Sequence, residues 1–316
     1  MRIAIYGAGG VGGHFGAQLA RAGQDVTFIA RGAHLRAIRD QGLHLETPAG
    51  EIVITPAKAT DDPADVGEVD AILVALKAWQ VTDAADAMRP MIGPDTVVVP
   101  LQNGVEAPSQ LAAVLGVKHA MGGLCGTISM VVAPGRIRSI GGPGFTSFIR
   151  FGELDNRRSE RAERLLQAFA NTPIQGEISP DILKALWEKF LFVSSFGGIG
   201  VLTRAPIGVI RTAAGTRALL ERCMQEVHAV GRARKVALDD AVVTNTMGFI
   251  DALPAGATTS LQRDIADGKP SELEAWNGAV VRLGREAGVA TPLHELIYHT
   301  ALPSERRARG ELTFPA

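Results

Sequence analysis

The sequence predicts a two-domain α/β protein, in which a doubly wound parallel sheet over residues 1–178 is followed by an all-helical domain over residues 179–316. Three observations lead to this prediction. Short apolar runs alternate with helical patterns early in the chain, as in strand–helix–strand units around a parallel sheet. After "ISPD" (178–181) the pattern becomes almost wholly helical. The length of 316 residues also exceeds what one hydrophobic core usually serves.

The first domain begins with alternating strands and helices. Its expected strands are short and apolar, whereas its expected helices carry apolar residues at helical spacing. In chain order we expect a strand at 2–7, a helix at 12–23, a strand at 25–31, a helix at 33–42 and a hairpin at 43–55. Two more buried strands follow at 69–77 and 95–104, with a helix between them.

The middle and the end of the chain differ in character from its start. Glycine-rich β segments at 119–153 indicate an antiparallel addition to the sheet, and 156–172 is a charged amphipathic helix. Helical patterns then continue to about residue 302. The tail 303–316 has no periodicity, so we expect it to fray.

Composition and charge argue against several classes of partner. The formal net charge is -1 and no basic tract is present, which disfavours nucleic acid and anionic membranes. The longest apolar runs, such as "AILVAL", have the length of a strand rather than of a membrane span. Cys125 and Cys223 are too few for a disulfide framework, and "MRIAIYGAGG" lacks the apolar stretch of a signal peptide. We therefore expect a cytoplasmic protein with no nucleic-acid or membrane partner.

The stretch "GAGGVG" matches the dinucleotide-binding pattern G-x-G-x-x-G. It comprises Gly7, Ala8, Gly9, Gly10, Val11 and Gly12. Glycines permit a tight turn and close approach of the backbone, and the start of the following helix then faces a pyrophosphate. A strand precedes the motif and an alanine-rich helix follows it, which is the context that a Rossmann-type domain requires. The alternative is a glycine-rich turn that binds nothing.

Arg31 ends the second expected strand, where a domain that prefers NAD usually carries a carboxylate. An arginine at this position suits a 2′-phosphate, so we expect NADP(H) as the cofactor. The alternative is an exposed charge at the end of a strand.

Polar side chains also follow two other expected strands. Lys77 ends "ILVALK", and Asn103 follows "VVVPLQ". Ligands of open α/β sheets gather at the carboxyl ends of the strands, so these residues form a plausible wall beside the nicotinamide. Taken singly, Lys77 also fits a solvated charge, and Asn103 before Gly104 also fits turn chemistry.

The helical domain offers candidates for the acid that protonates a substrate. Lys189 lies in "LWEKFLFVSSF", where its helical neighbours at three and four positions are apolar, and desolvation on such a face favours proton transfer by a lysine. Lys184 lies about 140° away around the helix and has Asp181 and Glu188 as spaced partners, so it fits the surface.

Ser260 and Glu272 stand out in a polar stretch of this domain. Glu272 has an alternative interpretation as a carboxylate at a helix start, because Ser271 follows Pro270. His294 and His299 are five positions apart, whereas a zinc-protease motif needs four, and no other metal spacing is present. We expect no metal site.

Taken together, "RIAIYGAGGVGG", "LKAWQV", "QNGVE", "LWEKF", "TSLQRDI" and "SELEAWNG" resemble the ketopantoate reductase family over nearly the whole chain. This resemblance implies a Rossmann domain followed by a helical domain similar to that of 6-phosphogluconate dehydrogenase. It implies NADPH-dependent reduction of 2-dehydropantoate in pantothenate synthesis. Lys189 matches the general acid, Ser260 a ligand of the substrate carboxylate, and Glu272 the acid that binds the substrate hydroxyl. Lys77 and Asn103 match the lining of the cleft, and Arg31 the 2′-phosphate ligand.

The chain departs from the family pattern at two positions. After the lysine the family has two asparagines that help to hold the substrate, whereas this chain has Val193 and Gly197. The alternative substrate is therefore another small 2-oxo acid that lacks the distal hydroxyl. A non-catalytic NADP-binding regulatory protein is the alternative from a different functional class. Helical second domains of this fold class often form dimers, so a homodimer is compatible with the sequence.

Overall fold

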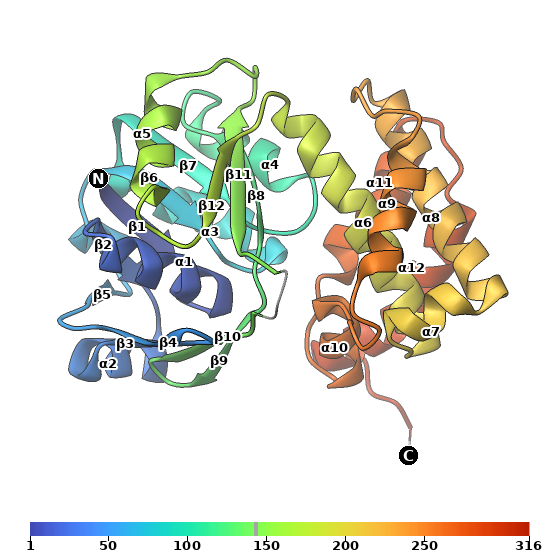
Figure 1. The fold of residues 1–316 in the computed structure, drawn as a ribbon, viewed down its shortest axis with the longest axis horizontal. Coiled ribbons are helices and arrows are strands. Elements are labelled where there is room, and N and C mark those ends of the chain that lie inside the picture. The colour runs from blue at the N-terminus through green and yellow to red at the C-terminus, as the bar shows by residue number, and fades with distance from the viewer. Residues whose placement is uncertain (142–144, 316) are drawn as a thin grey trace. The chain divides into compact units, whose positions relative to one another are not determined.

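Five parallel strands form the main sheet of the computed structural model (Figure 1), which describes residues 1–141 and 145–315. The strand order is β5-β2-β1-β6-β7. Their bounds are β1 Arg2–Tyr6, β2 Asp25–Ile29, β5 Lys58–Thr60, β6 Val69–Val74 and β7 Ile92–Pro100. Because the chain runs outward from β1 in both directions, the strand order reverses beside β1, where open α/β sheets bind ligands. The predicted doubly wound parallel sheet is confirmed.

Both faces of this sheet are buried under separate cores. Ile3 and Ile5 of β1 point into one core, and Ala4 and Tyr6 point into the other, as alternation along a strand requires. The first core contains residues of α1 (Gly10–Arg21) and α5 (Glu160–Phe169). The second core contains residues of α3 (Val81–Ala87) and α4 (Ala107–Leu115). Apolar strands buried on both sides explain why the sequence shows continuous apolar runs rather than alternation.

The segment 119–153 is not the antiparallel addition to the main sheet that the sequence predicted: it meets that sheet through a parallel bridge between Val98 of β7 and Ala120. It contributes to two other sheets, with strand orders β4-β3-β10-β9 and β12-β11-β8. Their bounds are β3 Leu43–Thr47, β4 Gly50–Ile54, β8 Met121–Gly126, β9 Ser129–Ala133, β10 Arg136–Ser139, β11 Phe148–Glu153 and β12 Gln175–Ile178. The predicted hairpin is confirmed as β3–β4, and β8 and β11 pair antiparallel.

Burial against α1 explains why β10 joins the hairpin. Ile137 of β10 is paired with Leu45 of β3, and both side chains are fully buried. A Cβ atom added at Gly13 of α1 would lie 2.7 Å from the Ile137 side chain. The small sheet therefore covers the side of α1 that the main sheet leaves open. Sequence periodicity identifies an apolar strand face but does not identify what it covers.

The remaining elements of the first unit are short. They are α2 Gly32–Gln41 and the 3₁₀ turns η1 Pro63–Asp65, η2 Ala78–Gln80 and η3 Arg89–Met91. The structure confirms a helix close to the predicted 33–42. The strands β5 and β12 were not predicted, because three or four residues are too few to show a period.

The second unit is helical. Its elements are α6 Ile182–Thr203, α7 Ile207–Thr212, α8 Ala214–Ala233, α9 Val242–Ala252, α10 Ser260–Ala266, the π-helical turn η4 Glu274–Gly278, α11 Ala279–Glu286 and α12 Pro292–Ala308. By length and composition α6 could cross a membrane, but 67% of its most apolar window is buried inside the protein. Its apolar side chains, including Trp187 and Phe190, belong to the core of this unit.

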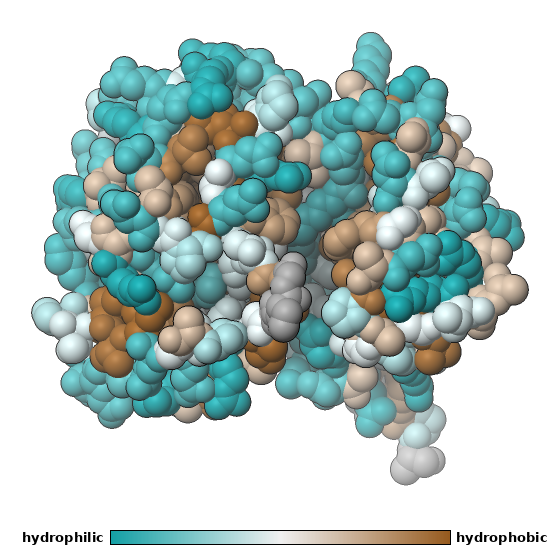
Figure 2. All heavy atoms as spheres, in the orientation of Figure 1, coloured by the Kyte–Doolittle hydropathy of each residue, from teal (hydrophilic) through white to brown (hydrophobic). Residues whose placement is uncertain are grey.

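Two sequence expectations need correction here. The tail was expected to fray from 303, but α12 continues to Ala308 with Pro303 inside it. Glu305 is buried, so this part of the tail contributes to the interior. The domain boundary was placed at 178, whereas contacts divide the chain at Ile182 and assign Asn103–Val105 to the second unit. On the face that Figure 2 shows, the surface of each unit is largely hydrophilic, with separate apolar patches.

Candidate functional site

The glycine-rich turn joins β1 to α1 at the carboxyl end of the main sheet. The backbone N–H groups of Gly7 and Ala8 both donate to the carbonyl of Ile29, at 3.1 Å each, which fixes the turn to the end of β2. Gly7 has φ +102°, a conformation that favours glycine. A Cβ atom at Gly12 would lie only 2.0 Å from the Gly7 carbonyl oxygen. Two of the motif glycines are therefore required by the turn itself.

The start of α1 is suited to an anion. Its N-cap residue, Gly9, provides no side-chain hydrogen bond, and no acidic residue lies in the first turn of the helix. Backbone N–H groups at a helix start have no helical partner, and they favour a phosphate by direction and by dipole. A Cβ atom at Gly9 would meet no described atom within 4 Å. The chain's residues thus fit the pyrophosphate of a dinucleotide.

Arg31 lies where the sequence placed it, exposed at the end of β2 and directly before α2. Its charge acts on Tyr6 at the end of β1: burial raises the pKa of the Tyr6 hydroxyl, and the guanidinium of Arg31 opposes that shift. Arg31 therefore lies, like the glycine-rich turn, at the carboxyl ends of the strands of the main sheet. This placement is compatible with a ligand of the 2′-phosphate.

His34 of α2 is a residue of this turn that the sequence interpretation missed. Its Nε2 lies 2.8 Å from the Ala8 carbonyl oxygen, and its Nδ1 accepts from the Gly135 N–H at 3.0 Å. Because Nδ1 accepts, Nε2 carries the proton that is donated to Ala8. His34 thus holds the glycine-rich turn against the loop before β10. A lone histidine in a helix gives no sequence signal for such a role.

Two more candidates follow strands of the main sheet. Lys77 follows β6, and its Nζ lies 5.9 Å from the centre of the Trp79 ring. Gln102 is buried and donates from Nε2 to the carbonyls of Val74 and Leu76, at 2.9 and 3.0 Å, so it ties the end of β7 to β6. Asn103 comes next and is half-buried. Gln102 is therefore structural, and Asn103 remains the candidate ligand.

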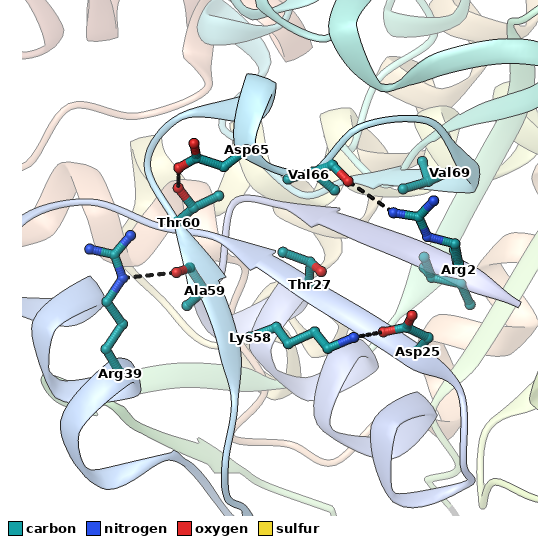
Figure 3. Close-up of a pocket in the computed structure, with 11 residues that line it drawn as sticks. Arg2, Asp25, Thr27, Arg39, Lys58, Ala59, Thr60, Asp65, Val66 and Val69 are labelled. Atoms are coloured by element: carbon teal, nitrogen blue, oxygen red, sulfur yellow. Dashed lines mark hydrogen bonds and ion pairs between the residues drawn. The ribbon is translucent and has the colours of Figure 1, made fainter.

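A recess of about 400 Å³ in the first unit lies near the amino ends of the strands of the main sheet (Figure 3). Its lining includes Arg2, Asp25, Lys58 and Val69, the first residues of four parallel strands. Charged groups in it are engaged locally: for example, Lys58 pairs with Asp25 at 2.7 Å. Ligands of α/β sheets bind at carboxyl ends, whereas this recess is at amino ends and contains none of the predicted site residues. We do not assign the cofactor to it.

Lys189 lies in the middle of α6 and is half-buried. Its neighbours one turn away, Leu186 and Val193, are buried, and its role as the general acid stays a prediction. Lys184 has different surroundings: its Nζ lies 2.7 Å from Asp239 and 3.9 Å from Glu188. The predicted pairing of Lys184 with Glu188 is thus present, together with a partner on the loop before α9.

Gly197, two turns after Lys189, is where three segments of the second unit meet. A Cβ atom at Gly197 would lie 2.8 Å from the Trp276 ring and 3.2 Å from the Leu261 side chain. Leu261 follows Ser260 at the start of α10, and Trp276 lies one turn after Glu272. The structure therefore brings together the segments that carry Lys189, Ser260 and Glu272.

Ser260 does not cap α10, and Glu272 lies directly before the helix that begins at Leu273, where the helix-start interpretation expects it. The cap of α10 is Thr259, whose Oγ1 accepts from the Gln262 N–H at 3.2 Å, so capping does not need the Ser260 hydroxyl. Glu272 is only 8% exposed, whereas a carboxylate that merely decorates a helix start would face solvent. Burial favours a specific role for Glu272.

The histidines of α12 belong to no group of three potential metal-binding side chains among the residues that the structure describes. His294 is fully buried and its Nδ1 lies 2.9 Å from Glu226 of α8. Burial raises the pKa of Glu226, but hydrogen bonds from His294 and from the backbone of Leu293 outweigh it, and the pKa lies below its ordinary value. His294 therefore joins α12 to α8.

Comparison with known proteins identifies the family. The model of the ketopantoate reductase PanE/ApbA family matches residues 3–155, and that of its C-terminal domain matches residues 181–303. A 2-dehydropantoate 2-reductase of Mesorhizobium japonicum is 34% identical, over 92% of this chain and 94% of the relative. The chain belongs to the ketopantoate reductase family.

Solved structures of ketopantoate reductases agree in fold. A PanE/ApbA family ketopantoate reductase from Ralstonia eutropha has a TM-score of 0.88 and 29% identity, covering 98% of this chain and 100% of that chain. A 2-dehydropantoate 2-reductase from Geobacter metallireducens has a TM-score of 0.87 and 29% identity, with the same coverage. The predicted fold class and the resemblance are therefore confirmed, and the protein is an oxidoreductase of the ketopantoate reductase type.

Proposed function

We propose that this protein uses NADPH to reduce a 2-oxo acid to a 2-hydroxy acid, with 2-dehydropantoate as the best substrate. The observation that carries the proposal is the meeting of three segments at Gly197, because these segments bear Lys189, Ser260 and Glu272. Relatives named 2-dehydropantoate 2-reductase support the choice of substrate. The product would serve pantothenate synthesis.

The cofactor would be held by this chain's first unit. The N–H groups at the start of α1 would bind the pyrophosphate, and Arg31 would pair with the 2′-phosphate. When bound, NADPH supplies a hydride to the substrate carbonyl carbon. Lys77 and Asn103 are proposed to line the cofactor and substrate site.

The second unit would supply the proton and the substrate contacts. As the carbonyl carbon gains the hydride, its oxygen becomes an alkoxide, and the Lys189 ammonium donates a proton from Nζ to it. The Ser260 hydroxyl would donate a hydrogen bond to the substrate carboxylate, which fixes the carbonyl in one orientation. The Glu272 carboxylate would accept a hydrogen bond from the substrate hydroxyl.

A second candidate substrate class is favoured by the surroundings of α6. Val193 is only 7% exposed, and Trp276 packs on Gly197, so neither position offers a hydrogen bond to a distal hydroxyl. A site without such a partner accepts an acid without that hydroxyl about as well. Small 2-oxo acids with an apolar side chain are therefore the alternative.

NADPH oxidation with two matched acids tests both candidates. One acid is 2-dehydropantoate, and the other is 3,3-dimethyl-2-oxobutanoate, which has the same carbon skeleton without the distal hydroxyl. We expect kcat/KM to favour 2-dehydropantoate by at least about tenfold, because Glu272 accepts its hydroxyl. A ratio near one would select the alternative class, and no oxidation with any 2-oxo acid would contradict the proposed function.

Cofactor preference is expected to depend on Arg31. Arg31→Glu replaces an attraction for the 2′-phosphate by a repulsion and provides an acceptor for the 2′-hydroxyl of NADH. We expect KM for NADPH to rise by about tenfold or more, and the ratio of kcat/KM values for NADPH and NADH to fall by about 10². Arg36→Glu, on the exposed side of α2, is the matched control. An unchanged ratio in Arg31→Glu would assign Arg31 to the solvated surface.

A further inference from the structure

Ser271, the residue before Glu272, is held by the last helix of the chain. Its backbone N–H donates to both carboxylate oxygens of Glu305, at 3.1 and 3.0 Å, and its Oγ–H donates to Glu305 Oε2 at 2.5 Å. Arg309 Nη2 donates to the Ser271 carbonyl at 3.0 Å. The backbone N–H, the carbonyl and the hydroxyl of Ser271 are thus all bound by side chains from the end of α12.

This contact is a buried, charge-assisted network. Ser271 is 0% exposed and Glu305 is 5% exposed, and Arg309 Nε donates to Glu305 Oε1 at 2.6 Å. Burying a carboxylate is costly unless it is paired and hydrogen-bonded, and here it is both. Simple capping of the helix at Leu273 needs only the Ser271 hydroxyl, which accepts from the Leu273 N–H at 3.3 Å. The Glu305–Arg309 pair therefore does more than a cap requires.

The other side of Glu272 is attached to α6, the helix of Lys189. The Glu272 carbonyl accepts from the Trp276 N–H at 3.0 Å, which links it to the π-helical turn. In that turn, Asn277 Nδ2 donates to the Ser194 carbonyl of α6 at 3.2 Å. Asn277 approaches α6 at Gly198. A Cβ atom at Gly198 would lie 2.6 Å from Asn277 Nδ2, so a larger residue there would collide with the amide. π-Helical turns are frequent at functional sites.

From these contacts we infer that Glu305 and Arg309 are positioning residues, which fix Glu272 between α12 and α6 for its contact with the substrate. The inference rests on the proposed function, in which Glu272 binds the substrate. It makes the end of the last helix part of the support of the site, although neither residue touches the substrate. Misplacing a substrate contact by about 1 Å can cost on the order of 10²-fold in rate.

A double-mutant cycle separates positioning from mere stabilisation. Glu305→Gln is expected to lower kcat/KM for 2-dehydropantoate by about tenfold or more in the wild-type background, but by less than about twofold in Glu272→Ala. KM for NADPH should stay within about twofold. Arg306→Ala is the matched control, since this exposed residue lies at the same helix end and pairs loosely with Glu311 at 4.0 Å. All variants are measured well below their melting temperatures.

Hydrogen exchange provides a readout that does not depend on turnover. Peptides covering 271–278 should exchange at least about tenfold faster in Glu305→Gln than in wild type or Arg306→Ala. If Glu305→Gln does not fold, Ser271→Ala is measured in its place, because it removes the two hydroxyl contacts, to Glu305 and to the Leu273 N–H, and leaves the backbone contacts of Ser271 in place. Unchanged exchange, or equal losses of activity in both backgrounds, would overturn the inference. If the wild type reduces no 2-oxo acid, the proposed function fails, and the exchange data still decide the role of Glu305.

Discussion

Replacing Lys189 by alanine is expected to lower kcat for reduction of the 2-oxo acid by about 10² to 10⁴. The reason is that the alkoxide formed at the substrate must be protonated, and the half-buried ammonium of Lys189 is the donor that we propose. KM for NADPH should change little, because the proposed phosphate ligands, Arg31 and the start of α1, lie in the other unit. Steady-state rates at saturating NADPH measure the effect.

Two further variants identify what the lysine supplies. Lys189→Arg keeps the charge but does not give up its proton, so a general acid predicts a loss close to that of alanine, whereas a purely electrostatic role predicts recovery. Lys184→Ala is the matched control on the same helix, since its ammonium is engaged with Asp239 at 2.7 Å. A kcat for Lys189→Ala within about threefold of wild type would rule out the lysine as the proton donor.

Local signals explain what could be predicted from the sequence. The glycine-rich turn depends in part on contacts between neighbours such as Gly7 and Gly12, so a short motif identifies it. Lys189 and Lys184 could be distinguished because helical spacing reports the surroundings of a side chain within one turn. The main sheet was predicted for the same reason, since each strand is an apolar run of its own.

Contacts between distant residues explain what was missed. Glu305 reaches Ser271 across a helical hairpin, and in sequence it is one of several charges in a polar tail. Likewise, β10 pairs with β3 although β6 and β7 both lie between them in the sequence. Burial against α1 selects this partner. The packing of Trp276 on Gly197 is also invisible in sequence, although the absent family asparagine at 197 pointed to a change there.

Gly12→Ala is expected to destabilise the fold and Gly9→Ala to leave its stability unchanged, whereas both are expected to weaken cofactor binding. At Gly12 a Cβ atom would lie 2.0 Å from the Gly7 carbonyl oxygen, so α1 must shift. Such overpacking costs about 1–3 kcal/mol of the free energy of unfolding. At Gly9 a Cβ atom meets no described atom within 4 Å, and φ is −69°, so the unliganded protein should melt like wild type.

Both variants should raise Kd for NADPH by about tenfold or more, as measured by fluorescence titration. Gly12→Ala distorts the turn, whereas Gly9→Ala places a methyl group where the pyrophosphate must approach the backbone. Gly248→Ala is the control, because its Cβ also meets no described atom within 4 Å but it lies on α9 in the other unit. Unchanged Kd in Gly9→Ala would mean that the pyrophosphate does not bind at the start of α1. Because Gly9→Ala is expected to leave the fold intact, a higher Kd in this variant reports cofactor binding alone and not damage to the turn.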